Sequence, residues 1–146
     1  MKNRSAVAAE KFVQGYNCAQ SVLWSFRDEL KLDADLALKV ACGFGGGIAR
    51  QQEVCGAVTG GIMALGLKHG RGENQDRVAT EQTYRKTQEL LRRFKLKHGS
   101  CLCRDLLQGC DLKTEAGQKF FHEQGLHDTI CKQCVQQVVN LVEELL

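Results

Sequence analysis

Eight cysteines, the most reactive side chains in this 146-residue sequence, determine what chemistry to expect of it. They occur from one end of the chain to the other, so any site that several of them share must be assembled by folding. The eight are Cys18, Cys42, Cys55, Cys101, Cys103, Cys110, Cys131 and Cys134. Thiols in a reducing compartment are more often metal ligands or redox groups than disulfide partners. The cysteine content therefore points to metal or redox chemistry.

The N-terminal segment predicts a cytoplasmic protein whose cysteines are kept reduced. Its short apolar patch, residues 6–9, is followed by Glu10 and Lys11, whereas a secretory signal needs an apolar stretch of about 7–15 residues. No segment approaches the roughly 18 consecutive apolar residues of a membrane span. We therefore expect no span across a membrane.

The length of the chain predicts one domain, residues 1–146. At about 150 residues, folding buries roughly 70% of the surface of the extended chain, which allows a hydrophobic core. With 8 cysteines in 146 residues, the cysteine fraction also stays below the roughly 8–10% typical of small disulfide-stabilised domains. The fold should therefore be stable without disulfides.

The elements that must position these cysteines are predicted to be helices. The chain has no proline, glycines separate the segments, and the apolar–polar alternation typical of strands is nearly absent. We expect an all-α fold, a compact bundle of about five to seven helices. Helices are expected at about 5–30, 34–42, 55–67, 72–98 and from about 128 onward, with helical turns near 104–108 and 115–124. The helix expected from about residue 128 has the most regular apolar stripe, which extends from Val135 to Leu146.

Cys55 is the cysteine for which unusual chemistry is most strongly indicated. It precedes an uncharged segment, residues 56–67, that should form a buried helix, and the unpaired N–H groups and dipole at a helix start stabilise a thiolate. Gly56 leaves room beside it for a ligand or a second sulfur. Small residues on one side of this helix allow another backbone or a compact cofactor to approach: Ala57, Gly60, Gly61 and Ala64. The alternative is that Cys55 is a small buried apolar residue.

Cys18 gives a weaker signal. It lies roughly 120° around its predicted helix from the centre of the apolar stripe, so it is not simply part of the core-facing side. Asn17 and Gln20 are close enough in sequence to hydrogen-bond to its sulfur.

Two close cysteine pairs occur in the second half of the chain, Cys101-Leu102-Cys103 and Cys131-Lys132-Gln133-Cys134. A Cys-x-x-Cys at a helix start holds a metal or cycles as a dithiol. The βαβ frame of thioredoxin-like proteins is absent, and residue 135 is Val rather than the His of covalent haem attachment. A zinc ribbon would need two such pairs, and the sequence has one.

Histidines and charge runs are predicted to be structural. The histidines stand near predicted helix ends, where capping or exposed roles are expected; they are His69, His98, His122 and His127. Nine Lys or Arg against four acids lie between Lys68 and Lys97, a pattern typical of a solvated helix face. Only Tyr84 and Phe94 interrupt these charges, which makes a poor platform for stacking bases. We therefore expect no nucleic-acid binding. An acidic protein that binds this basic stretch remains an alternative.

Several segments, read together, resemble a known family. They are Asn17–Leu23, Gly45–Ile48, Cys55–Gly61, Cys103–Leu107 and Cys131-Lys132, which span almost the whole chain. The chain is similar to the redox-active proteins named for their C_GCAxxG_C_C cysteine signature. Carried over by motif, the signature cysteines are Cys18, Cys55, Cys103 and Cys131. The resemblance implies a redox role with iron–sulfur or other metal binding. The family is also similar to part of the split-Soret cytochromes, but their haem motif is missing here, so we expect no haem.

Three functional hypotheses result. The leading one is a small electron-transfer protein whose four signature thiolates hold an iron–sulfur cluster, because four thiolates match the usual ligand count; Cys55 and Cys131 would enter from helix N-termini. The second is a metal-free thiol–disulfide protein in which Cys55 attacks and Cys18 or Cys103 resolves. The third is a structural zinc site in an interaction module.

The sequence leaves the redox partner and any enzymatic turnover open. A homodimer is compatible with a glycine-lined helix. Four cysteines lie outside the signature and could serve a second site or simply pack: Cys42, Cys101, Cys110 and Cys134.

Overall fold

The computed structural model describes residues 3–146, and these fold into helices and connecting turns, which confirms the predicted all-α class. The helices are α1 (Arg4–Val13), α2 (Cys18–Ser25), α3 (Ala34–Ala41), α4 (Gly45–Ile48), α5 (Gly56–His69), α6 (Arg77–His98), α7 (Cys103–Leu106), α8 (Glu115–Glu123) and α9 (Lys132–Leu145). A 3-10 turn, Cys42–Phe44, precedes α4, and a π-helical turn, His127–Cys131, precedes α9. Among these residues, no helix is long and apolar enough to span a bilayer.

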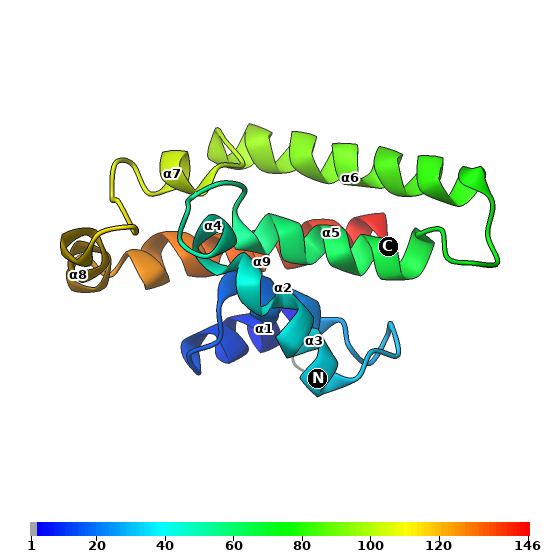
Figure 1. Ribbon diagram of the computed structural model, residues 1–146, viewed down its shortest axis with the longest axis horizontal. Helices are drawn as coiled ribbons and strands as arrows, with labels where there is room; N and C mark the ends of the chain where they lie inside the picture. The colour runs from blue at the N-terminus through cyan, green and yellow to red at the C-terminus, as the bar shows by residue number, and fades with distance from the viewer. Residues whose placement is uncertain (1–2) are drawn as a thin grey trace.

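Helix α5 lies at the centre of the molecule. Figure 1 shows α6 running antiparallel to α5 on one side, α9 behind α5, and α1, α2 and α3 grouped on the other side. A Cβ on Gly60 would lie 2.8 Å from the carbonyl oxygen of Ala19 in α2, and one on Gly61 would lie 2.7 Å from Cγ1 of Val138 in α9. The small-residue stripe therefore lets α5 pack closely against two neighbouring helices.

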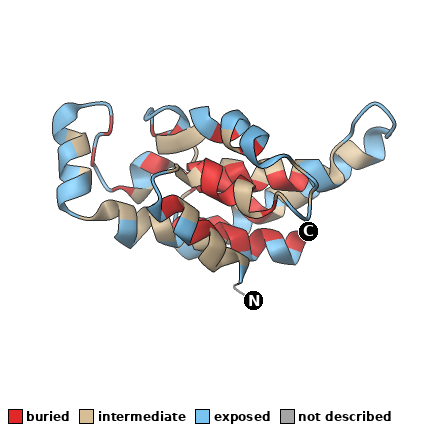
Figure 2. Cartoon of the chain, turned by 90° about the horizontal axis from the view of Figure 1, so that it is seen from below, coloured by how far each residue is buried: buried red, intermediate tan, exposed pale blue. Residues whose placement is uncertain are grey.

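The buried residues concentrate in the central helices, as Figure 2 shows. The predicted apolar stripe of the last helix is confirmed by four fully buried valines of α9: Val135, Val138, Val139 and Val142. Helix α6 contributes Leu90 and Phe94 to the core, and the rest of its polar sequence is at least partly exposed. Helix α8, at one end of the molecule, contributes no buried residue.

The single helix predicted over residues 5–30 is wrong, because the chain breaks it into α1 and α2. Gly15 between them has a φ of +105°, which residues other than glycine rarely adopt. Asn17 then caps α2: its side-chain oxygen accepts from the N–H of Gln20, whose own side chain accepts from the N–H of Asn17. Cys18 is consequently the first residue of a helix, instead of lying in the middle of one.

Candidate functional site

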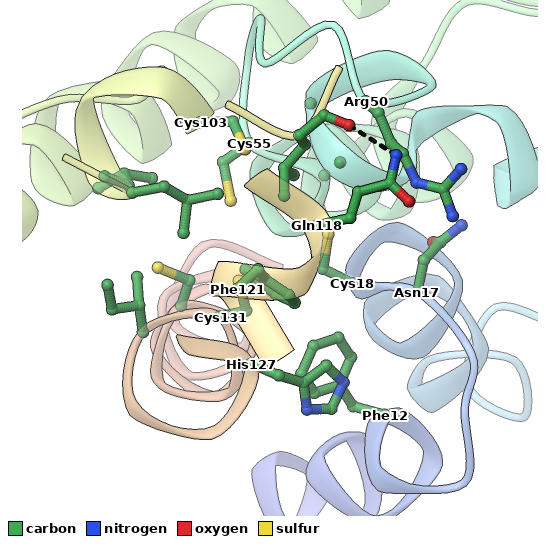
Figure 3. Close-up of a pocket in the computed structure, with 18 of the residues that line it drawn as sticks. Phe12, Asn17, Cys18, Arg50, Cys55, Cys103, Gln118, Phe121, His127 and Cys131 are labelled. Carbon is green, nitrogen blue, oxygen red and sulfur yellow. Dashed lines mark hydrogen bonds between the residues drawn. The ribbon is translucent and has the colours of Figure 1, made fainter. Parts of the chain in front are cut away.

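A cavity of about 340 Å³ lies between the starts of α2, α5 and α7, the π-helical turn and α8. Five cysteines line it: Cys18, Cys55, Cys103, Cys131 and Cys134. Figure 3 shows the first four around the same space, with Gln118 and Phe121 reaching in from α8. Folding therefore makes neighbours of the four signature cysteines, although they come from separate segments.

Cys18 is held at the cavity by the cap of α2. The Nδ2 of Asn17 donates to the carbonyl oxygen of Cys42 at 2.9 Å, and the Nε2 of Gln20 donates to the carbonyl oxygen of Leu38 at 3.0 Å. Because both amides serve the cap and these carbonyls, they anchor the helix start rather than bind the Cys18 sulfur, as the sequence had suggested they could.

Cys55 and Cys103 are brought together by a short antiparallel contact. The N–H of Cys55 donates to the carbonyl oxygen of Cys101 at 2.8 Å, and the N–H of Cys103 donates to the carbonyl oxygen of Glu53 at 2.7 Å. Val54 and Leu102 form the bridge between these two bonds. This pairing places the start of α7 beside the start of α5, and both thiols face the cavity.

The glycine run beside the cavity folds as a left-handed turn. Residues 46–50 have φ values from +48° to +67°, and each of the three that is not glycine costs about 1–2 kcal/mol in this conformation. Such strain persists where the surroundings hold it, often at functional sites. A Cβ on Gly47 would lie 2.6 Å from the Cβ of Cys103, and the N–H of Gly46 is directed at the Cys18 sulfur. The turn therefore connects two walls of the cavity.

Gly56, which follows Cys55 in the signature, is required by close packing against Cys18. A Cβ at this position would overlap the Sγ of Cys18 and lie 2.7 Å from the carbonyl oxygen of Phe44. The space that the sequence predicted beside Cys55 is thus occupied by a second sulfur.

The side chains of Cys18, Cys55 and Cys134 interact in the cavity wall. The interaction with the Cys55 thiol and burial raise the pKa of Cys18 well above its usual value. The interaction with Cys134 and burial raise the pKa of Cys55, against opposing contributions from Cys18 and from the N–H of Ala57. The expected stabilisation of a Cys55 thiolate by the helix start is therefore wrong in its net direction, because neighbouring sulfur and burial outweigh the helix terminus.

The other two signature thiols are also held in their neutral form. Burial raises the pKa of Cys103 to about 12, and the sulfurs of Cys18 and Cys110 add to the shift. Burial likewise raises the pKa of Cys131, with contributions from the same neighbouring sulfurs. Each thiolate would repel the others, and a metal cation reverses this preference by binding the deprotonated form.

Cys134 is the member of the site that sequence reasoning left unassigned. It is 2% exposed, lines the cavity and contacts the Cys55 sulfur. Its spacing of three residues from Cys131, which puts both on one helical face, was the available signal. Cys131 ends the π-helical turn that begins at His127 and directly precedes α9, so it lies near the start of the last helix, where the sequence predicted it.

The remaining cysteines face elsewhere. The thiol of Cys101 donates to the carbonyl oxygen of Leu91 at 3.7 Å, away from the cavity, so Cys103 is the member of its pair that lines the site. The thiol of Cys110 donates to the carbonyl oxygen of Gly117 at 3.2 Å, behind Cys103. Cys42 is exposed.

Aromatic side chains also line the cavity. His127 stacks on Phe12 with ring centroids 3.9 Å apart, and Phe121 meets the same histidine edge to face. His122 also lines the cavity. These two histidines thus belong to the site wall, a role that their positions near helix ends did not indicate.

A family model described as "Putative redox-active protein (C_GCAxxG_C_C)" matches residues 16–145, nearly the whole chain. No curated protein and no solved structure matches the chain. The cysteines that fit the signature all line the cavity. The chain therefore belongs to the redox-active protein family that is defined by the C_GCAxxG_C_C cysteine signature.

Proposed function

We propose that this redox-active protein carries electrons by holding an iron–sulfur cluster in the cavity. The ligands would be Cys18, Cys55, Cys103 and Cys131. The observation that carries the proposal is that these four cysteines, from four segments, line one pocket. A shared centre is the simplest reason for a fold to collect buried thiols whose pKa values are raised.

The donor set suits such a cluster. Thiolates are its usual ligands, and four is the usual number. Among residues 3–146, no three ligand-type side chains converge closely enough to hold a single metal ion. The thiols instead surround a cavity of about 340 Å³, which favours a group of several metal atoms over one ion.

Backbone N–H groups of the chain would stabilise the thiolates. Those of Gly46 and Ala19 are directed at the Cys18 sulfur, and that of Ala57 is directed at the Cys55 sulfur. Hydrogen bonds to sulfur and exclusion of water set the potential of such a centre. When bound, the cluster would accept one electron and pass it on to a partner.

Purification without oxygen tests the proposal. We expect a coloured protein that contains iron and acid-labile sulfide, and changing each signature cysteine in turn to Ala should remove most of the iron. Cys42→Ala alters an exposed cysteine outside the cavity and should leave the iron content unchanged. A protein that stays colourless and iron-free after reconstitution contradicts the proposal, and zinc without iron would favour a structural zinc site.

A metal-free thiol–disulfide protein is the second candidate, favoured by the contacts of the Cys55 sulfur with Cys18 and Cys134. Cys55 would lose its proton and attack one sulfur of a small-molecule disulfide, whose S–S bond breaks and whose other half leaves as a thiol after protonation. The Cys18 thiolate would then attack the mixed disulfide and release the second thiol. Two protein thiols are oxidised, and the small disulfide takes up two electrons and two protons.

Mass-spectrometric mapping after mild oxidation separates this candidate from the first. It predicts the loss of two thiols and a reversible disulfide that includes Cys55. Because the pKa of Cys55 is raised, the reaction should be slow at neutral pH and accelerate as the pH rises. Retention of all thiols under these conditions would exclude it.

A further inference from the structure

Gln52 is an unusual residue beside the cavity. Its side chain is 5% exposed, and its backbone φ is +57°. Burying an amide costs free energy unless its N–H and its oxygen are both hydrogen-bonded. A left-handed φ is costly for a residue other than glycine. A residue with both features needs strong contacts to hold it.

Both ends of the Gln52 amide have partners. Its Nε2 donates to the carbonyl oxygen of Cys110 at 2.7 Å, and its Oε1 accepts from the N–H of Leu112 at 3.0 Å. The segment that the amide holds packs with Cys103 in one apolar cluster, to which Cys110 and Leu112 belong. The Gln52 side chain also opposes the rise in the pKa of the Cys103 thiol that burial causes. One side chain therefore ties the left-handed turn to the loop behind a cavity thiol.

The backbone makes the same connection from a second direction. The N–H of Arg104 donates to the carbonyl oxygen of Gln52 at 3.2 Å, and the N–H of Cys103 donates to the carbonyl oxygen of Glu53 at 2.7 Å. These bonds hold the start of α7 against the segment that follows the turn. The backbone of Gln52 and Glu53 therefore holds Cys103 from one side, and the Gln52 side chain holds the loop behind it.

We infer that Gln52 is a positioning residue, whose amide holds the loop at Cys110 and Leu112 behind Cys103 and so fixes the Cys103 sulfur at the cavity wall. The ligand role of Cys103 rests on the proposed function, whereas the position of its sulfur does not. Glutamine suits this role because one flat group supplies the donor and the acceptor that the buried loop requires.

Cysteine labelling of the reduced, metal-free protein tests the inference directly. Gln52→Met keeps the length of the side chain and removes its polar groups, and Gln51→Met makes the same change at an exposed neighbour. Alkylation of Cys103, mapped by mass spectrometry, should be about tenfold faster in Gln52→Met, because loss of buried hydrogen bonds eases local opening. Cys101, which is buried outside the cavity, should keep its wild-type rate.

Two results overturn the inference. Equal Cys103 rates in the two methionine variants would mean that the amide does not hold the sulfur. Parallel acceleration at Cys101 would mean that Gln52 only supports the fold. Gln52→Glu, which keeps an acceptor for Leu112 and loses the N–H donor, is the second variant if Gln52→Met does not fold, with the same acceleration expected at Cys103.

Iron binding gives an independent readout. In reconstituted protein, Gln52→Met should lower the affinity for iron about 10- to 100-fold, whereas Gln51→Met should keep the wild-type affinity, because residue 51 is exposed. Equal affinities in the two methionine variants contradict the inference. If the wild-type protein takes up no iron, the proposed function fails, and the labelling rates still decide the positioning role.

Discussion

Replacing Gly56 by Ala should displace the Cys18 sulfur from the cavity. A Cβ on Gly56 would overlap the Sγ of Cys18 and lie 2.7 Å from the carbonyl oxygen of Phe44 and 3.3 Å from the nitrogen of Ala19. Backbone atoms cannot rotate away as a side chain does, so the start of α5 must shift away from α2. Overpacking of this kind costs about 1–3 kcal/mol in the free energy of unfolding.

Gly66, in the same helix, provides the matched control. No heavy atom lies within 4 Å of the position of its Cβ, so an added methyl group meets open space. Gly66→Ala should stabilise the protein by about 0.5–1 kcal/mol, because alanine has the higher helix propensity. We expect the two variants to differ by about 1.5–4 kcal/mol, with Gly56→Ala the less stable.

Urea denaturation of the reduced, metal-free protein, followed by circular dichroism, measures this difference. Iron content after reconstitution reports on the site: Gly56→Ala should lower it through the displaced Cys18, and Gly66→Ala should keep the wild-type value. Equal stability with full iron in both variants would contradict this prediction, because the Cys18 sulfur would then tolerate a methyl group where the structure leaves no space.

The cap of α2 and the buried thiols lead to two more expectations. Asn17→Ala should lower the free energy of unfolding by about 1 kcal/mol and should also lower the iron content. Asn3→Ala, which uncaps α1, should lower the free energy of unfolding by a similar amount and keep the iron content. Equal iron contents in the two variants would contradict the link between the cap of α2 and Cys18. The free energy of unfolding of the reduced, metal-free protein should fall as the pH rises from about 9 to about 12. Folding raises the pKa of Cys103 from 9.0 to about 12, so the unfolded chain loses this proton first. Denaturant unfolding at a series of pH values measures this slope, which should be shallower in Cys103→Ala; identical slopes would show that this thiol is not held neutral by the fold.

Several features of the fold could be predicted because their causes act over a few residues. The valine stripe of α9 and the uncharged run of α5 follow from helical periodicity. The break before α2 was missed, although the capping-box pattern of Asn17 followed three residues later by Gln20 was present in the sequence. Apolar residues on both sides of the break made one helix look continuous.

Only some residues of the candidate site could be predicted from the local sequence. Cys55 and Cys103, which the signature selects by the residues next to them in the sequence, both line the cavity. The signature gave no reason to include Cys134. Only the residues that follow Cys103 favoured Cys103 over Cys101. Which way a thiol points depends on the helices packed around it.

The helical class and the set of cysteines that could react follow from the sequence, since propensity, periodicity and motif spacing are properties of neighbouring residues. Which sulfurs face one cavity, and in which direction their pKa values move, depends on how distant segments pack together. The pKa of Cys55 shows the reason: the helix start that favours its thiolate is local, whereas the Cys134 contact and the burial that outweigh it come from segments far apart in the chain.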